Sequence, residues 1–309
     1  MNERIVFLGT PEISAICLEG LIKAGRNIVG VVTKEDKEKG RNKVREESPV
    51  SQIANQYHIP LHKPRKLNND YEIVKEWKPD LLLTFAFGQI LSETVLSLGK
   101  YKPLNLHGSL LPKYRGAAPM QYALLNGDKE TGVTLRERVK ERDAGDRYGT
   151  KVIPLTEKDN YSSLCKKMAD AALELAVEKL PLYFEGKLTP VKQDPSLVTF
   201  THRIKKEDEH LSLDCSSEEF VNHVRALSLT PGGYLLLENQ PIKIYEAEKY
   251  NDEKTREAGT IVLAHKKDII LQLTKGQVRL TLLQRPGKKR RSAQDFNNGV
   301  RDFQGKVLK

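Results

Sequence analysis

Strand-like and helix-like segments alternate along the first third of the chain, and this alternation restricts the possible folds more than any other feature. Apolar runs rich in β-branched residues predict strands at 4–9, 27–33, 59–64, 80–85 and 103–108. Helical periodicity lies between several of them, at 12–24, 50–57, 70–77 and 92–98. This order predicts an α/β fold with a doubly wound, mostly parallel, Rossmann-like sheet that carries helices on both faces.

The pattern changes after the fifth predicted strand. Two strands around a turn at 143–146 and a helix over 160–184 are predicted to complete the first domain. A short helix at 216–227 is followed by closely spaced short strands, which predict a smaller β-barrel of the oligonucleotide-binding (OB) type. We therefore expect an α/β domain at 1–188, a linker at 189–206 and a C-terminal OB-like domain at 207–309.

Asn105 and His107 lie at the end of the fifth predicted strand. Doubly wound sheets bind their ligands at the carboxyl ends of the strands. Residues two apart in a strand share a face, so these two side chains point the same way, about 6–7 Å apart. The first strand ends in "GTPE" without a GxGxxG pattern, so a dinucleotide cofactor has little support.

Composition and cysteine usage exclude several classes of protein. The longest apolar runs stop short of the roughly 18–20 residues that a transmembrane helix needs. The first residues, "MNERIVFLG", lack the apolar core of a signal peptide, so we expect a cytoplasmic protein with no membrane partner. Cys17, Cys165 and Cys215 are scattered without metal-ligand spacing, so neither disulfides nor a metal site is predicted.

The stretch "NLHGSLLPKYRGAAPMQ" at 105–121, followed by "DAGD" at 143–146, resembles the folate-dependent formyltransferases. "HGSLLP" together with "RGAAP" is a far more specific pattern than a lone glycine motif. The likeness covers nearly the whole chain, through the segments "FLGTPE" (7–12), "SPV" (48–50), "FAFGQIL" (85–91), "NGDKETGVT" (126–134) and "PGKK.RSAQDF" (286–296).

The resemblance implies an enzyme that transfers a formyl group from 10-formyltetrahydrofolate to the α-amino group of methionine on initiator tRNA, in translation initiation. It implies folate as co-substrate and no metal. Asn105, His107 and Asp143 match the catalytic trio of the family. The residues that it implies for the folate pocket are Phe87, Gly88, Gln89, Ile90, Leu91, Ser109, Leu110, Leu111 and Pro112.

The chemistry of formyl transfer agrees with these residue types. An amine that attacks a formyl carbonyl forms a tetrahedral species, which needs an oxyanion donor and a proton carrier but no covalent nucleophile. Asn105 can supply the neutral donor, and His107 can donate to the oxyanion or move the proton. Asp143 can position His107, stabilise its cation or accept the proton through water. Ser109 admits a hydrolase interpretation, but the glycine-flanked nucleophile elbow is missing.

Basic residues suggest a polyanionic partner. The formal net charge is +10, with much of the excess in 279–309 and a second basic stretch in the loop at 34–48. Long loops of this kind are often functional. By resemblance, initiator methionyl-tRNA would be held by Arg41 and Lys43 in the loop and by Lys288, Lys289, Arg290 and Arg291 in the barrel.

Five arginines depart from the family pattern, which usually has apolar residues there: Arg136, Arg138, Arg142, Arg147 and Arg291. Unpaired guanidinium groups are costly to bury. Arg136 and Arg138 must therefore reach solvent, pair with Glu137 or Glu141, or disturb the strand that precedes Asp143. Either a basic surface for tRNA or an altered sequence of an ordinary enzyme would explain them.

Two alternatives stay open at this point. One is a formyltransferase for a small amine, such as a nucleotide sugar or glycinamide ribonucleotide. The other is a catalytically silent nucleic-acid-binding protein on the same scaffold, since function depends on the site rather than on the fold. We expect the protein to be a monomer.

Overall fold

The computed structural model describes residues 2–39 and 43–309, and the chain forms two compact units. The first unit comprises Met1–Ala117, Glu130–Pro154 and Cys165–Thr201. The second unit comprises Ala118–Lys129, Leu155–Leu164 and His202–Lys309, so it includes two short segments from the first half of the chain. The predicted limits at 188 and 206 stay predictions.

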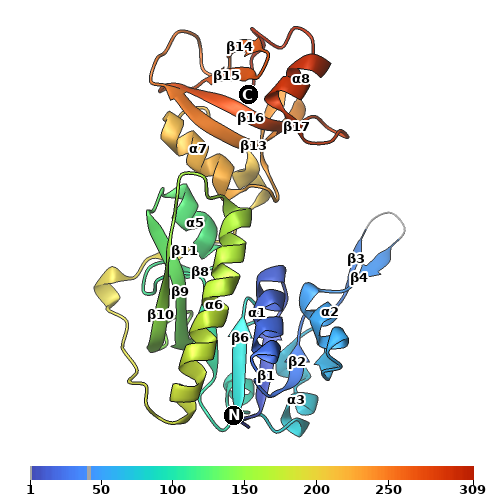
Figure 1. Ribbon diagram of the computed structural model, residues 1–309, viewed down its shortest axis with the longest axis vertical. Coiled ribbons are helices and arrows are strands. Elements are labelled where there is room, and N and C mark those ends of the chain that lie inside the picture. Colours follow the sequence, from blue (N-terminus) through green and yellow to red (C-terminus); the bar gives the residue numbers. More distant parts are fainter. Residues whose placement is uncertain (1, 40–42) are drawn as a thin grey trace. The chain divides into compact units, whose positions relative to one another are not determined.

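A seven-stranded sheet forms the centre of the first unit, in the order β10-β9-β7-β6-β1-β2-β5 (Figure 1). Hydrogen bonding runs parallel from β7 to β5 and antiparallel at β9 and β10. The mostly parallel sheet is therefore confirmed. The strands are β1 (Ile5–Gly9), β2 (Ile28–Val32), β5 (Leu61–His62), β6 (Leu81–Phe85), β7 (Leu104–His107), β9 (Glu130–Glu137) and β10 (Arg147–Pro154).

Helices cover both faces of this sheet, as expected for a doubly wound fold. On one face α1 (Glu12–Lys23) and α6 (Tyr161–Phe184) pack so closely that a Cβ at Gly20 would collide with Leu173. On the other face Val6 and Leu8 of β1 pack against Val74 and Val95. The remaining helices of the unit are α2 (Pro49–Gln56), α3 (Glu72–Glu76), α4 (Glu93–Leu96) and short 3₁₀ turns at Leu67–Asn69 and Pro195–Leu197.

The basic loop predicted at 34–48 contains a short antiparallel hairpin, β3 (Lys37–Lys39) and β4 (Val44–Glu46). Lys37 faces Glu46 and Glu38 faces Arg45, so opposite charges pair across the strands and support the register. Arg41, one of the residues expected to contact tRNA, lies outside the described residues. Lys43 is exposed beside the hairpin.

The chain between 191 and 201 belongs to the first unit. Val191 exchanges backbone hydrogen bonds with Arg147, and β11 (Phe200–Thr201) pairs in parallel with β8 (Arg115–Gly116). Part of the predicted linker therefore pairs with β8, which lies within the motif at 105–121, and with Arg147 of β10.

The second unit is built on an antiparallel sheet of six strands, with β12-β13-β16-β15-β14 in order and β17 beside β16. The last residues of the chain close this sheet: Leu236 and Lys309 exchange backbone hydrogen bonds, and Ile261 N donates to Lys306 O at 2.8 Å. The predicted antiparallel β domain is confirmed. Its elements are α5 (Pro119–Leu125), a 3₁₀ turn (Lys206–Glu209), α7 (Ser217–Ala226), β12 (Gly233–Leu237), β13 (Gln240–Asn251), β14 (Ile261–His265), β15 (Asp268–Gln272), β16 (Gln277–Gln284), β17 (Arg291–Ser292) and α8 (Ala293–Gly299).

Candidate active site

Asn105 lies on β7, between β6 and β9, with Thr84 and Arg136 as its register partners. The Thr84 hydroxyl donates to Asn105 Oδ1 at 2.5 Å. Both side chains are buried. Among the residues that the structure describes (2–39 and 43–309), none forms a hydrogen bond with Asn105 Nδ2. Its two N–H groups are therefore available as donors.

His107 ends the same strand, and its side chain is buried. Its Nε2 lies 2.8 Å from the Tyr114 carbonyl oxygen. A carbonyl only accepts, so Nε2 carries a proton and Nδ1 is the basic atom of the neutral ring. Nδ1 lies 3.7 Å from Asp143 Oδ1. Burial lowers the pKa of His107; Asp143 opposes this shift and the Arg136 cation adds to it.

Asp143 lies in the turn between β9 and β10, where its backbone adopts the left-handed conformation with φ +54°. Its Oδ2 accepts a hydrogen bond from Gly116 N at 2.7 Å. Gln193 Nε2 donates to the carbonyls of Asp143 and Gly145, at 2.7 and 2.8 Å. Burial would raise the pKa of Asp143, but His107 and Arg136 outweigh it, and the pKa lies below its usual value.

Arg136 is almost completely buried and pairs with the catalytic-site candidate Asp143, not with Glu137 or Glu141. Its Nη2 lies 2.5 Å from Asp143 Oδ1, and its Nη1 donates to the Glu137 carbonyl at 2.9 Å. The expected partners are engaged elsewhere, since Glu137 pairs with Lys102 and Glu141 with Arg115. β9 pairs with both neighbours at Arg136, and on the β10 side a register shift follows between Arg147 and Gly149, so the pairing continues past the buried guanidinium.

Arg138 is half-buried and spans two parts of the site. Its Nη1 donates to Thr84 Oγ1 at 3.0 Å and its Nη2 to the Gln89 carbonyl at 2.7 Å. Burial, together with the charge of Arg136, lowers the pKa of Arg138 to about 10. Of the remaining arginines, Arg147 donates to the Leu111 carbonyl at 2.8 Å, and Arg142 is exposed.

The predicted folate segment at 87–91 follows β6. Leu67 N donates to Gln89 Oε1 at 2.9 Å, which ties this turn to the neighbouring 3₁₀ turn. Phe87 and Leu91 are buried, whereas Ile90 is 85% exposed, which is unusual for so large an apolar side chain. Gly88 has a φ of +80°, a conformation that favours glycine.

The second predicted folate segment, 109–112, is held by Thr134 of β9. Thr134 Oγ1 donates to the Ser109 carbonyl at 2.7 Å and accepts from Leu111 N at 3.1 Å. The Ser109 hydroxyl is buried and donates to the Lys113 carbonyl at 2.6 Å. A donor role toward a backbone carbonyl argues against the hydrolase interpretation of Ser109. Leu111 and Pro112 are buried, and Leu110 is partly exposed.

Sequence reasoning did not identify Thr84 or Gln193. Thr84 is the one hydroxyl in the apolar run "LLLTF", which could have marked it as a polar residue next to the site. Gln193 lies 50 residues from Asp143, in the predicted linker, and no local pattern indicates its contact with the turn.

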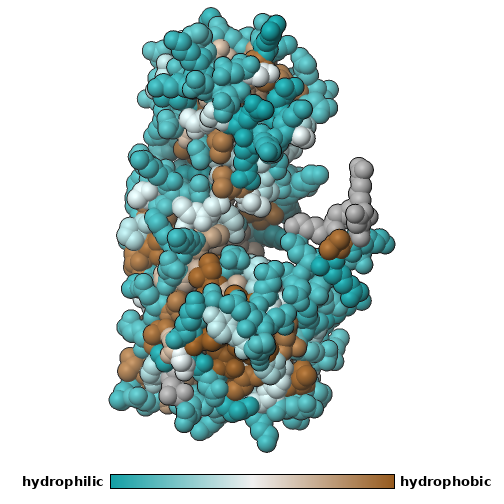
Figure 2. Space-filling model, turned by 45° about the vertical axis from the view of Figure 1, so that its right-hand side comes forward, coloured by the Kyte–Doolittle hydropathy of each residue, from teal (hydrophilic) through white to brown (hydrophobic). Residues whose placement is uncertain are grey.

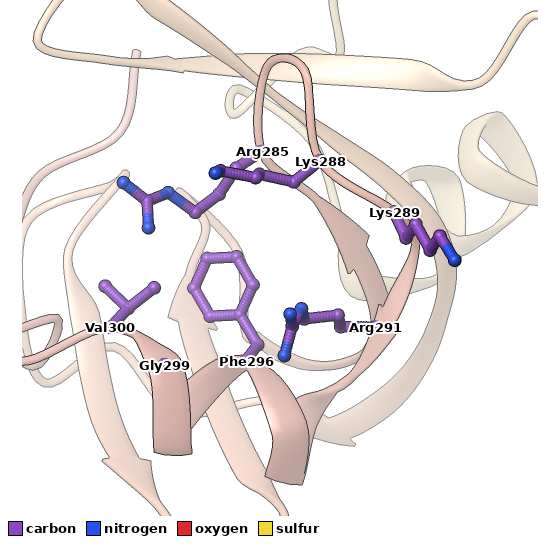
Figure 3. A pocket seen from close by; sticks show the side chains of 7 residues that line it. All are labelled: Arg285, Lys288, Lys289, Arg291, Phe296, Gly299 and Val300. Carbon is purple, nitrogen blue, oxygen red and sulfur yellow. The ribbon is translucent and has the colours of Figure 1, made fainter.

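Exposed basic side chains of the second unit surround a cavity of about 240 Å³. Figure 3 shows the guanidinium group of Arg291 turned toward the ring of Phe296, with Arg285 and Lys288 across the cavity. None of the lining cations pairs with a carboxylate of the described chain. Arg290 points elsewhere and stacks on Tyr245, 4.3 Å from the ring centroid.

Figure 2 shows a mostly hydrophilic face on the second unit and larger hydrophobic patches on the first. No helix in the described part of the chain is both long and apolar enough to span a membrane. Over the same residues, no group of three or more His, Cys, Asp or Glu side chains could hold a metal ion. Burial raises the pKa of the Cys17 thiol to about 12.

Comparison with known families identifies the family of this chain. Residues 3–180 match the family model "Formyl transferase", and residues 203–301 match "Formyl transferase, C-terminal domain". The chain belongs to the formyl transferase family. It is 39% identical over 297 residues to the methionyl-tRNA formyltransferase of Lactobacillus johnsonii, covering 96% of this chain and 95% of that protein.

Solved structures share the fold at low sequence identity. An N-formyltransferase from Helicobacter canadensis, in complex with folinic acid and dTDP-3-aminofucose, matches with a TM-score of 0.66 at 19% identity, over 91% of this chain and 99% of that one. HypX from Aquifex aeolicus, in complex with tetrahydrofolic acid, matches with a TM-score of 0.66 at 18% identity, over 96% of this chain and 47% of that one.

Proposed function

We propose that this protein transfers the formyl group of 10-formyltetrahydrofolate to the α-amino group of methionyl-tRNA. The observation that carries the proposal is the similarity to a named methionyl-tRNA formyltransferase along almost the full length of both chains. The geometry around Asn105, His107 and Asp143 supports it, because the cluster offers an amide donor and a basic imidazole nitrogen without a covalent nucleophile.

The reaction requires a new bond between the methionine nitrogen and the formyl carbon, while the bond from that carbon to N10 of the folate breaks. The amine gives up a proton, and N10 of the leaving folate takes one. We assign the Nδ2 group of Asn105 to the developing oxyanion. We assign the proton to Nδ1 of His107, since Nε2 is engaged by Tyr114. Asp143, 3.7 Å from Nδ1, would stabilise the imidazolium.

We assign the folate to the two segments 87–91 and 109–112. These segments offer backbone groups and apolar side chains, which would suit a flat, partly polar heterocycle. The Gln89 carbonyl is one acceptor of this wall, and Arg138 donates to it. Bound there, 10-formyltetrahydrofolate supplies the formyl carbon.

We assign the tRNA backbone to the basic cavity of the second unit. Arg285, Lys288, Lys289 and Arg291 present donors without carboxylate partners in the described chain, as expected for phosphate contacts. Lys43 and Arg290 stay candidates for further contacts, although Arg290 is partly occupied by Tyr245. A monomeric state and a cytoplasmic location are parts of the same proposal.

The alternatives have weaker support. The N-formyltransferase structure with dTDP-3-aminofucose is only 19% identical to this chain, so it supports the fold alone. The relative from Lactobacillus johnsonii, which matches over 96% of this chain, is named a methionyl-tRNA formyltransferase. A silent binding protein would not need Asn105, His107 and Asp143 together.

A competition assay tests the proposal. Purified protein is mixed with 10-formyltetrahydrofolate and, in separate reactions, methionyl-tRNA, glycinamide ribonucleotide or a nucleotide-linked amino sugar. We expect formyl transfer to methionyl-tRNA alone. Transfer to a small amine with none to methionyl-tRNA would overturn the proposed acceptor. Binding of tRNA without transfer to any acceptor would favour the silent protein.

A further inference from the structure

We propose that Thr84 is a positioning residue for formyl transfer. Its hydroxyl holds the Asn105 amide in the one orientation that offers N–H groups to the reacting carbonyl. The inference rests on the proposed function, because it takes Asn105 as the oxyanion donor.

The distance between the two side chains determines how the amide is turned. Thr84 Oγ1 and the facing Asn105 atom are 2.5 Å apart. Hydrogen bonds of the O–H···O type range from about 2.5 to 3.0 Å, whereas N–H···O bonds range from about 2.7 to 3.2 Å. The facing atom is therefore the amide oxygen, and Nδ2 points away from Thr84.

Arg138 fixes the direction of the Thr84 hydroxyl. Its Nη1 donates to Thr84 Oγ1 at 3.0 Å, and a guanidinium group can only donate. The single proton of Thr84 must then go to another acceptor. Asn105 Oδ1 at 2.5 Å is closer than the Leu104 carbonyl at 3.3 Å. Arg138 therefore donates to the Thr84 hydroxyl, and the Thr84 hydroxyl donates to Asn105 Oδ1.

An oxyanion donor works by being oriented before the reaction begins. An amide free to turn would also present Oδ1 to the developing negative charge, which is repulsive. Thr84 is fully buried on β6, next to Asn105 in the sheet register, so the backbone holds the two groups together. Thr84 touches no reacting atom in this account and acts through Asn105.

Steady-state kinetics of Thr84→Val tests the inference, since valine keeps the shape and removes the hydroxyl. With methionyl-tRNA and 10-formyltetrahydrofolate as substrates, we expect kcat to fall by roughly tenfold and KM to change by less than about twofold. The expected loss of kcat is smaller than the roughly 10²–10³-fold loss caused by removing an oxyanion donor completely, because Asn105 is still present. Thr84→Ser keeps the hydroxyl and should stay within about twofold of wild type. If Thr84→Val does not fold, Thr84→Cys, with its weaker donor, should give an intermediate loss of kcat.

The Asn105→Ala background separates positioning from a general structural effect. Thr84→Val should cause no further loss of kcat there, because the group that Thr84 holds is gone. An equal loss in both backgrounds, or a Thr84→Val enzyme with wild-type kcat, would overturn the inference.

The side-chain amide resonances of Asn105 give a readout that does not depend on turnover. Thr84→Val should shift these ¹⁵N and ¹H resonances, and Thr84→Ser should leave them close to wild type. If the wild-type protein transfers no formyl group, the proposed function is wrong. The Asn105 resonances would still show whether Thr84 holds the Asn105 amide. Resonances that Thr84→Val leaves unmoved would overturn the inference.

Discussion

Asp143 lies beside two basic side chains of one buried cluster, Arg136 and His107, and Arg136 is the nearer. Arg136 Nη2 lies 2.5 Å from Asp143 Oδ1, whereas His107 Nδ1 lies 3.7 Å from the same oxygen. The carboxylate is thus shared. Burial lowers the pKa of His107 and favours its neutral form, and the guanidinium charge of Arg136 adds to this effect. A neutral imidazole near physiological pH can accept the proton of the attacking amine, which is the role assigned to Nδ1.

Replacing Arg136 by methionine should raise the pKa of His107. The substitution removes a nearby positive charge and leaves Asp143 free to stabilise the imidazolium. NMR titration of the His107 ring protons measures the change. Arg147→Met is the matched control and should move the pKa less, since Arg147 is bonded to Leu111 instead. A lower His107 pKa in Arg136→Met would contradict the assignment of the charges.

The lowered pKa of His107 also affects folding. Its folded-state pKa lies below the unfolded value of about 6.5, so protonation opposes folding. This contribution to stability is complete above about pH 6.5 and is lost as the pH falls through the folded-state pKa. Unfolding of Arg136→Met should therefore depend less on pH in this range than unfolding of the wild type.

Arg138 differs from Arg136 because it has no carboxylate partner among the described residues, only two neutral acceptors. Arg138→Met should remove an uncompensated charge and stabilise the protein by about 1 kcal/mol, which raises the melting temperature by about 2–4 °C. Arg142→Met, at an exposed position of the same turn, should leave it unchanged. A lower melting temperature for Arg138→Met would show that its two hydrogen bonds outweigh the cost of the charge.

At the scale of elements, the turn between β9 and β10 brings Asp143 to the strand that carries His107. Gly116 N donates to the Asp143 carboxylate, and Arg136 pairs with the same group. Gln193 Nε2 donates to the backbone carbonyls of Asp143 and Gly145. Gly145 is buried against β9, where a Cβ would collide with the Glu137 carbonyl oxygen.

Gly145→Ala should therefore displace the turn and reduce both stability and formyl transfer. The collision involves backbone on both sides, so neither partner can move cheaply. Thermal unfolding and kcat measure the two effects. Gly299→Ala is the control for stability, because nothing lies within 4 Å of its added Cβ. A Gly145→Ala enzyme with wild-type kcat would mean that the position of the turn does not matter for the reaction.

The central parallel strands of the first unit could be predicted because β1, β2 and β6 are each a continuous apolar run in the sequence. Pairings between distant short segments could not be predicted. β8 and β11 have two residues each and lie 85 positions apart, and residues 305–309 close the second sheet by bonding to β12 and β14. Such pairings depend on the whole fold, since two residues carry no periodicity.

The grouping of the three candidate residues could also be predicted from the sequence, although their catalytic role stays a prediction. Asn105 and His107 share a strand, and Asp143 lies in a motif of the family. The partner of Arg136 could not be predicted, because the local candidates Glu137 and Glu141 are turned toward Lys102 and Arg115. The turn that follows β9 places the Asp143 carboxylate beside Arg136. Gln193, which is 50 residues from Asp143 in the sequence, holds this turn.

At the scale of the whole molecule, the net charge of +10 favours association with a polyanion. The cavity of the second unit collects exposed cations from the strand β17 and the loop before it. Each phosphate contact displaces condensed counterions, so affinity for tRNA should fall steeply as salt rises.

Replacing Arg285, Lys288, Lys289 and Arg291 by alanine should weaken tRNA binding and reduce its salt dependence. Each lost phosphate contact lowers the slope of log K against log salt by about 1. Binding titrations at several salt concentrations measure the slope. The control replaces Lys254 and Arg256, which are exposed in the same unit and do not line the cavity. An unchanged slope in the fourfold variant would exclude the cavity as a tRNA contact.

The proposed mechanism depends most directly on His107 as the proton carrier of a formyl transfer to methionyl-tRNA. The measurement is the single-turnover rate of formylation by His107→Ala beside wild type, together with the affinity of each for methionyl-tRNA. We expect the rate to fall by roughly 10²–10⁴-fold, as for the loss of a general base, while the affinity for tRNA stays the same. A His107→Ala enzyme that formylates methionyl-tRNA at the wild-type rate would contradict the proposed role of His107.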